Sequence, residues 1–222
     1  MFTDDLIVLD FETTGLSPSR GDRITEVGAM RVKGGRIVDR YHSLAHCGVR
    51  ISPFIAAYTG ISQAMVDAAP PVRRVIGELL EFIGDTAIVA HNASFDQRFL
   101  DSECKLVNRR RANSPFICSM RVSRRVYPQF GSHALGALAH ELSIAYHGAA
   151  HRAEADAEVT ANVVIRIGQD LRSRHKGLSP DSALLRRIMD MPVSMAGDIL
   201  NRRTGYLAAG SDESDKREFR PR

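Results

Sequence analysis

The 222-residue sequence predicts an α/β fold in which helices flank a mixed five-stranded sheet. Three strand patterns follow one another near the N-terminus, at residues 5–11, 24–32 and 36–44, and consecutive strands of this kind pair antiparallel. Two short apolar strands, at 86–90 and 116–118, then alternate with helical patterns, which predicts parallel pairing in the same sheet. A chain of this length can bury one core of good size.

The first strand and the hairpin after it carry clear local signals. Leu6, Ile7, Val8 and Leu9 form a continuous apolar run, which is typical of a strand buried on both faces. Lys33-Gly34-Gly35 separates the second strand from the third and indicates a hairpin.

Helices are predicted in the segments between and after these strands. Apolar residues recur at helical spacing over 72–83, and another helix, 94–107, follows the fourth strand. Further helices are predicted at 53–65, with an interruption at 58–61, and at 119–126, 132–142 and 152–168.

The character of the sequence changes towards its C-terminal end. We divide the chain into a main domain at 1–171, a helical extension at 172–208 and a tail at 209–222. Ser179-Pro180-Asp181 predicts a helix start with proline in the first turn, and a second helix is expected around 195–200. The tail is polar and charged, and we expect it to be disordered.

Composition and charge predict a cytoplasmic protein that meets a polyanion and no membrane. The sequence shows no signal peptide and no membrane-length apolar stretch, and its three cysteines form no C-x-x-C pair. The net charge is +4, yet residues 105–140 carry +7, while 1–104 together with 141–169 carry −6. An acidic core beside a basic band suits a metal site that receives a polyanion, although a basic helix face is often only solvated. Phosphate contacts or plain solvation are the two interpretations for Arg109, Arg110, Arg111, Arg124 and Arg125.

Two carboxylates stand at the end of the first strand. Asp10 and Glu12 are two residues apart, so they project from one face of a strand with roots ~6–7 Å apart. That spacing suits two divalent ions ~3.5–4 Å from each other, with one carboxylate bridging them. Taken alone, the pair would be two acids at the exposed end of a strand.

Two further clusters contain acids. His91-Asn92-Ala93-Ser94-Phe95-Asp96 follows the fourth strand and places Asp96 in the first turn of a helix. His151-Arg152-Ala153-Glu154-Ala155-Asp156 opens the last long helix. Five residues of α-helix turn ~500°, so His151 and Asp156 would diverge if both were helical. They converge only if His151 lies on the loop before the helix.

The motifs D-x-E-T-T-G at 10–15, H-N-x-x-F-D at 91–96 and H-x-A-x-x-D at 151–156 together resemble those of the DEDDh exonucleases (DnaQ-like). The resemblance covers about residues 5–170, in the right order and spacing. Secondary matches are Glu26-Val27-Gly28, Thr59-Gly60-Ile61 and Ser132-His133-Ala134-Leu135. The resemblance implies a ribonuclease H-like fold and two divalent cations, Mg²⁺ or Mn²⁺. It also implies that nucleoside 5′-monophosphates are released from a free 3′ end.

The resemblance also assigns roles to the five residues. Asp10 would bridge the two ions, Glu12 and Asp156 would complete the ligands of the ion on the nucleophile side, and Asp96 would hold the second ion. His151 would take the proton from the attacking water, because a histidine side chain titrates near pH ~6.5.

The family also suggests which residues meet the substrate. Backbone N–H groups of the turn after the first strand would contact the terminal 3′-hydroxyl, and Leu16 and Ile61 would separate the last bases. Plain core packing is the alternative for Leu16 and Ile61. The expected substrate-binding set is Thr13, Thr14, Gly15, Leu16, Gly60, Ile61 and Asn92.

Three functions remain open at this point. A 3′–5′ exonuclease acting on single-stranded DNA, in proofreading or repair, is favoured. RNA 3′-end trimming or oligoribonucleotide degradation is the alternative on the same fold. A non-catalytic nucleic-acid-binding scaffold is disfavoured by the intact acids and His151. Expected partners are nucleic acid with a free 3′ end and either a DNA polymerase catalytic subunit or a second copy of the chain, although the extension shows no sliding-clamp motif.

Overall fold

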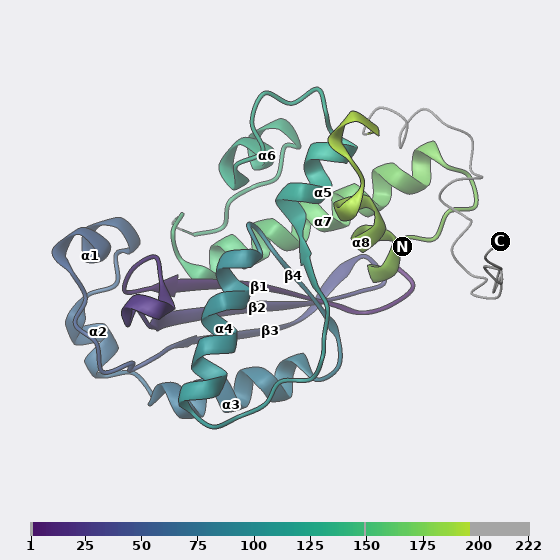
Figure 1. Cartoon of the computed structure of the whole chain (residues 1–222). Helices are drawn as coiled ribbons and strands as arrows, with labels where there is room; N and C mark the ends of the chain where they lie inside the picture. The colour runs from purple at the N-terminus through teal and green to yellow at the C-terminus, as the bar shows by residue number, and fades with distance from the viewer. Residues whose placement is uncertain (1, 149, 196–222) are drawn as a thin grey trace, which may run out of the picture.

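The computed structural model describes residues 2–148 and 150–195 and has the predicted α/β architecture (Figure 1). Its sheet has the strand order β3-β2-β1-β4-β5. β1 pairs antiparallel with β2, β2 antiparallel with β3, and the two later strands are parallel to β1. The strands are β1 (Leu6–Thr13), β2 (Ile24–Lys33), β3 (Arg36–Leu44), β4 (Ala87–Ala90) and β5 (Phe116–Cys118). The predicted fold class is therefore confirmed.

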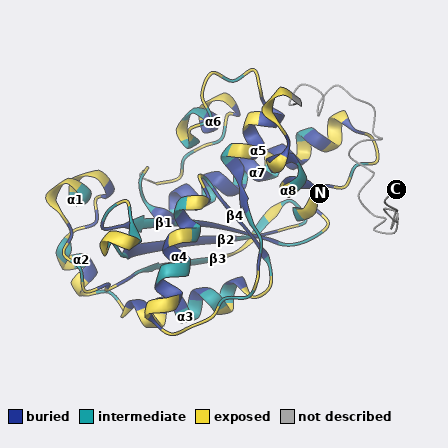
Figure 2. Cartoon of the chain, viewed as in Figure 1, coloured by how far each residue is buried: buried dark blue, intermediate teal, exposed yellow. Residues whose placement is uncertain are grey.

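Helices cover both faces of this sheet, and β1 is buried between them (Figure 2). Leu6 and Val8 join the core cluster shared with one helical layer, and Ile7 and Leu9 join the cluster on the opposite face. The first layer contains α5 (Ser119–Val126), α6 (Leu135–Glu141), α7 (Ala153–Arg174) and α8 (Ser182–Asp190). The second contains α3 (Val72–Ile83) and α4 (Ser94–Leu106). Because side chains of β1 alternate between the two core clusters, all four residues at 6–9 are apolar.

Two short helices, α1 (Pro53–Thr59) and α2 (Gln63–Asp67), lie beside the end of the sheet (Figure 1). The predicted interruption is present, but it begins at Gly60 rather than at residue 58, because Gly60 caps α1 with a left-handed φ of 71° and Ser62 caps α2. Two other boundaries differ from the prediction. The residues before Leu135 are not helical, and α7 runs on to Arg174 rather than ending at 168.

The start of the helical extension packs onto the core. α8 begins after Asp181, whose side chain accepts a hydrogen bond from the Leu184 amide at 2.7 Å. Pro180 therefore precedes the cap, and its predicted place in the first turn is wrong. α8 buries Leu184, Leu185, Ile188 and Met189 in the same cluster as α5 and α7. The expected second helix, apart from Met195, and the tail at 209–222 lie outside the described residues.

The helices of the described chain also bear on the membrane question. None of them is both long and apolar enough to span a bilayer.

Candidate active site

The two acids of β1 stand where that strand leaves the core. Leu9 and Phe11 are buried, whereas the alternating residues Asp10 and Glu12 keep partial exposure. Asp10 lies opposite Gly28 on β2, and Glu12 lies opposite Glu26. The two carboxylates therefore share the face of the sheet that α7 covers, as the strand spacing predicted.

Asp96 joins them from the start of α4. It sits in the first turn of that helix and its side chain is buried. Burial, with a smaller contribution from the charge of Glu12, raises the pKa of Asp96 to about 8, although hydrogen bonds from the main-chain amides of Asp96 and Phe11 oppose the rise. These interactions place Asp96 next to β1.

The loop before α7 brings in the remaining two residues. α7 begins at Ala153 after the cap residue Arg152, so His151 is outside the helix, with a left-handed φ of 62°. Its amide donates a hydrogen bond to Asp156 Oδ2 at 3.2 Å. Potential ligand atoms of Glu12, His151 and Asp156 all lie within 4.8 Å of one another. The structure therefore places His151 on the loop before α7, as its convergence with Asp156 requires.

Ionisation of all four carboxyl groups is unfavourable in this environment unless a positive charge is bound. Burial raises the pKa of Asp10 well above its usual range, and the charges of Asp96, Asp156 and Glu12 add to the rise. Burial and the charge of Asp156 raise the pKa of Glu12 to about 8, and Arg152 opposes this. The pKa of Asp156 is raised too, mainly by burial. Clustered carboxylate oxygens are the ligands that Mg²⁺ and Mn²⁺ prefer, so these residues fit divalent cations.

The turn after β1 is held rigid by Asp22. Its carboxylate accepts a hydrogen bond from the Ser17 amide at 2.9 Å and lies 3.4 Å from the Thr14 hydroxyl. A Cβ on Gly15 would come within 2.4 Å of Asp22 Oδ1, so any other residue there would displace the Asp22 carboxylate. Thr13 and Thr14 are buried, whereas the side chain of Leu16 is 79% exposed.

The other residues expected to contact substrate differ in their exposure. Ile61 is completely buried in a small cluster with Cys47, Ile51 and Val66. The structure thus places Ile61 in core packing, whereas a side chain that separates bases must reach the surface. Asn92 is exposed at a left-handed φ of 65° in the turn before α4.

Two arginines of the basic band make contacts within the fold. Arg111 donates to Asp101 at 2.7 Å, and Arg125 is buried with its Nε donating to the Met191 carbonyl at 2.7 Å. The phosphate-binding interpretation is therefore wrong for Arg111 and Arg125, because their guanidinium groups are committed to the fold. Arg109, Arg110 and Arg124 are exposed.

Three aromatic side chains near the acids carried no recognised signal in the sequence. The ring of Tyr58 lies 4.0 Å from that of His151, and Phe54 stacks on Tyr58 at 6.1 Å. Phe54 and Tyr58 are 74% and 52% exposed. Two aromatic residues four apart on a helix lie on one face, and this spacing could have been found in the sequence. The Tyr146 hydroxyl donates to Asp156 Oδ1, a contact from an irregular loop that no spacing indicates.

Adding Mg²⁺ is expected to raise the melting temperature more at pH 8 than at pH 5. Because the pKa values of Glu12 and Asp96 are about 8 in the folded protein, against ~4 in an unfolded chain, ionising them costs stability. The metal-free protein should therefore lose stability as the pH rises from ~4 to about 8. A cation at 100 times its dissociation constant restores ~2.7 kcal/mol.

Thermal unfolding with EDTA as the metal-free reference measures this difference. Potassium chloride at matched ionic strength controls for simple screening. An equal shift at both pH values, or the same shift with potassium, would contradict a cation site made of these acids.

Comparison with known proteins relates this geometry to one family. A family model described as exonuclease (RNase_T) matches residues 7–164. The PolC-type DNA polymerase III of Bacillus subtilis is 39% identical over 167 residues, which cover 74% of this chain and 11% of that protein. The chain thus spans about a ninth of that relative. The DNA polymerase III subunit epsilon of Aquifex aeolicus is 31% identical over 165 residues, covering 74% of this chain and 81% of that protein.

Solved structures show the same fold. Exonuclease X in complex with 5′ overhanging duplex DNA superposes with a TM-score of 0.65 at 28% identity, covering 83% of this chain and 99% of that one. The nuclease domain of 3′hExo, a DEDDh family member bound to rAMP, has a TM-score of 0.66 at 20% identity, covering 77% of this chain and 95% of that one, and is similar in fold alone.

Proposed function

The chain belongs to the exonuclease family whose model spans residues 7–164, and from this premise we propose that it is a DEDDh-type 3′–5′ exonuclease that shortens single-stranded DNA. It would remove one nucleotide at a time from the free 3′ end and release nucleoside 5′-monophosphates. The observation that carries this proposal is the convergence of Glu12, His151 and Asp156 within 4.8 Å, next to Asp10 and Asp96.

The acids would hold the cations and His151 would move the proton. Two divalent ions, bound by Asp10, Glu12, Asp96 and Asp156, would supply electrostatic activation of water and stabilise the charge on the leaving 3′-oxygen. In our proposal a water oxygen bonds to phosphorus as the bond to the 3′-oxygen breaks. His151 accepts the proton that the water loses, and the released 3′-oxygen is protonated from solvent. The backbone bond from His151 to Asp156 keeps the imidazole beside the acids.

The proposed direction of attack rests on the turn after β1. Its backbone lies directly beyond Glu12, where the Thr14 amide donates to the Arg23 carbonyl at 2.9 Å and Asp22 accepts from the Ser17 amide at 2.9 Å. Because the Thr14 N–H is used within the fold, we propose the amide of Gly15, which lies between these two contacts, as the main-chain donor to the terminal 3′-hydroxyl.

A 5′-labelled single strand is expected to shorten stepwise from its 3′ end into a ladder. A strand blocked by a 3′-phosphate should resist, because the added charge meets the acids where the hydroxyl should lie. Denaturing gel electrophoresis of the labelled products measures both results. Internal cutting of a circular single strand would overturn the exonuclease polarity.

Single-stranded substrate is proposed because exposed apolar side chains lie beside His151. Phe54 and Tyr58 form a stacked pair that ends at the His151 ring, and unpaired bases stack on such rings with ~1–3 kcal/mol per base. A base in an intact duplex has no free face to offer them.

Phe54→Ala is expected to raise the KM for a single strand about tenfold with little effect on kcat, since stacking worth ~1.4 kcal/mol is lost. Steady-state kinetics on matched single-stranded and blunt duplex DNA measure the effect. Val38→Ala, at an exposed position on β3, is the control for loss of a surface apolar group. If Phe54→Ala weakens duplex and single strand equally, the stacking proposal is wrong.

DNA is proposed over RNA because the named relatives are DNA polymerase III proteins. RNA trimming remains the second candidate, since the hydrolysis itself is indifferent to the 2′-hydroxyl. Degradation of DNA and RNA oligonucleotides of one sequence decides between them: faster loss of RNA would reverse the assignment. The same relatives support a proofreading or repair role beside a polymerase catalytic subunit, with self-association as the alternative partner.

A further inference from the structure

The start of α7 is held on the sheet by two residues of β2 that lie outside the group of acids. Glu26 and Gly28 are two residues apart, so both face α7. In the pairing with β1 they lie opposite Glu12 and Asp10. The E-V-G sequence therefore backs directly onto the candidate active site.

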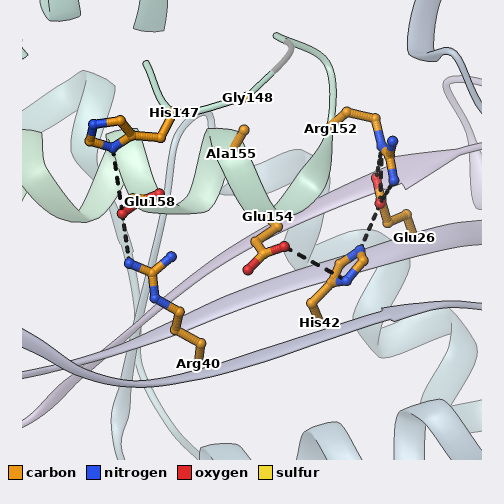
Figure 3. A pocket seen from close by; sticks show the side chains of 9 residues that line it. All are labelled: Glu26, Arg40, His42, His147, Gly148, Arg152, Glu154, Ala155 and Glu158. Atoms are coloured by element: carbon orange, nitrogen blue, oxygen red, sulfur yellow. Dashed lines mark hydrogen bonds and ion pairs between the residues drawn. The ribbon is translucent and has the colours of Figure 1, made fainter. Parts of the chain in front are cut away.

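Glu26 is the anchor of this arrangement. Its carboxylate is fully buried and accepts hydrogen bonds from Arg152 Nη2 at 2.6 Å and from Arg152 Nε at 3.1 Å (Figure 3). It also accepts one from the Ala153 amide at 3.0 Å. His42 Nε2 lies 2.8 Å away. Burial raises the pKa of Glu26, but the hydrogen bonds from His42, Arg152 and Ala153 outweigh it and lower the pKa to about 2. A charged carboxylate thus holds both the side chain and the backbone at the first turn of α7.

Gly28 allows α7 to approach that closely. A Cβ at this position would lie 2.2 Å from the Ala153 carbonyl oxygen and 2.5 Å from the Glu154 amide. These are backbone atoms that cannot move aside without moving the helix. Any side chain at residue 28 would therefore push the start of α7 away from β2.

We propose that Glu26, Gly28 and Arg152 form a positioning device for His151 and Asp156, an inference that rests on the catalytic roles proposed for those two residues. Arg152 is covalently next to His151, whose left-handed φ of 62° is unfavourable for a residue with a side chain. The ion pair with Glu26 holds the chain on one side of His151, and the hydrogen bond to Asp156 holds His151 itself. Without the Glu26 carboxylate, the segment before α7 can leave its strained conformation, and the imidazole of His151 is displaced.

A purely structural role is the alternative, and α7 offers a matched control for it. Farther along the helix, Glu158 pairs with Arg40 of β3 at 2.7 Å (Figure 3). This contact also joins α7 to the sheet, but it touches neither His151 nor Asp156. Arg40→Gln therefore removes a sheet-to-helix ion pair that contacts neither His151 nor Asp156, while Glu158 keeps its contact with His147 at 3.9 Å.

Glu26→Gln keeps the size of the side chain and removes its charge, and Arg152→Lys keeps the charge and removes the two-pronged contact. We expect kcat to fall about 10- to 100-fold in Glu26→Gln, and less in Arg152→Lys, with KM for a single strand nearly unchanged. Arg40→Gln should leave kcat within about twofold of the wild type, as is usual for an exposed ion pair. All rates are taken at saturating Mg²⁺ and well below the melting temperature of each variant.

A double variant separates positioning from stability. If Glu26 acts through His151, Glu26→Gln should cost much less in a His151→Ala background than in the wild type. Equal losses in both backgrounds, or a lower melting temperature with kcat intact, would overturn the inference. A His151→Ala variant with wild-type rate would instead refute the proposed catalytic role, so the two failures are distinguishable.

Discussion

Replacing Asp10 with alanine is expected to remove nearly all hydrolysis and leave the protein folded. Asp10 is the acid on which the charges of the other three converge, and we propose that it bridges both cations. Loss of the bridging ligand removes ~4 kcal/mol or more of transition-state stabilisation, which is ~10³-fold or more in rate. The fold should survive because burial already disfavours the ionised form of Asp10.

The rate on a single-stranded oligonucleotide and the melting temperature in EDTA test both halves of this expectation. Asp39→Ala is the matched control, since Asp39 is an exposed acid of β3 that accepts only from the neighbouring Arg40 amide among the described contacts. Wild-type protein should likewise lose its activity in excess EDTA and recover it with Mg²⁺ or Mn²⁺. Retained activity in Asp10→Ala, or undiminished hydrolysis in chelator, would refute the metal site.

Replacing His151 with alanine is expected to lower kcat by ~10²–10⁴-fold, the usual contribution of a general base. The Mg²⁺ concentration for half-maximal activity should change little, because the four acids that hold the cations remain. Saturating Mg²⁺ should not restore the rate, because added cation does not replace a proton acceptor. Asp156→Ala should behave differently and raise the metal requirement along with the loss of rate.

Steady-state kinetics across Mg²⁺ concentration distinguish a proton acceptor from a metal ligand at His151. His140→Ala, at an exposed position on α6, is the control for removal of a histidine. If His151→Ala mainly raises the metal requirement, His151 is a ligand. If the rate hardly changes, the water loses its proton to another group and the proposed mechanism is wrong.

The sheet and the acids were predictable because their signals are local. An apolar run marks a strand buried on both faces, and the alternation of side chains along it determines that Asp10 and Glu12 share one face. Asp96 follows directly on β4 and so enters at the first turn of α4. The sequence predicted that His151 and Asp156 converge only if His151 lies outside the helix. In the structure His151 precedes α7 and has a left-handed backbone.

By itself the sequence determined the fold class, the family resemblance and the acids at the ends of their elements, because periodicity and short spacings encode these features. Only the tertiary structure decided which side chains serve the site and which serve the core. Ile61 and Arg125 matched functional expectations yet are buried, and Tyr58 reaches His151 from another element. Glu26 and Arg152 are 126 residues apart. Such contacts depend on how whole elements pack against one another, and spacing along the chain carries no information about them.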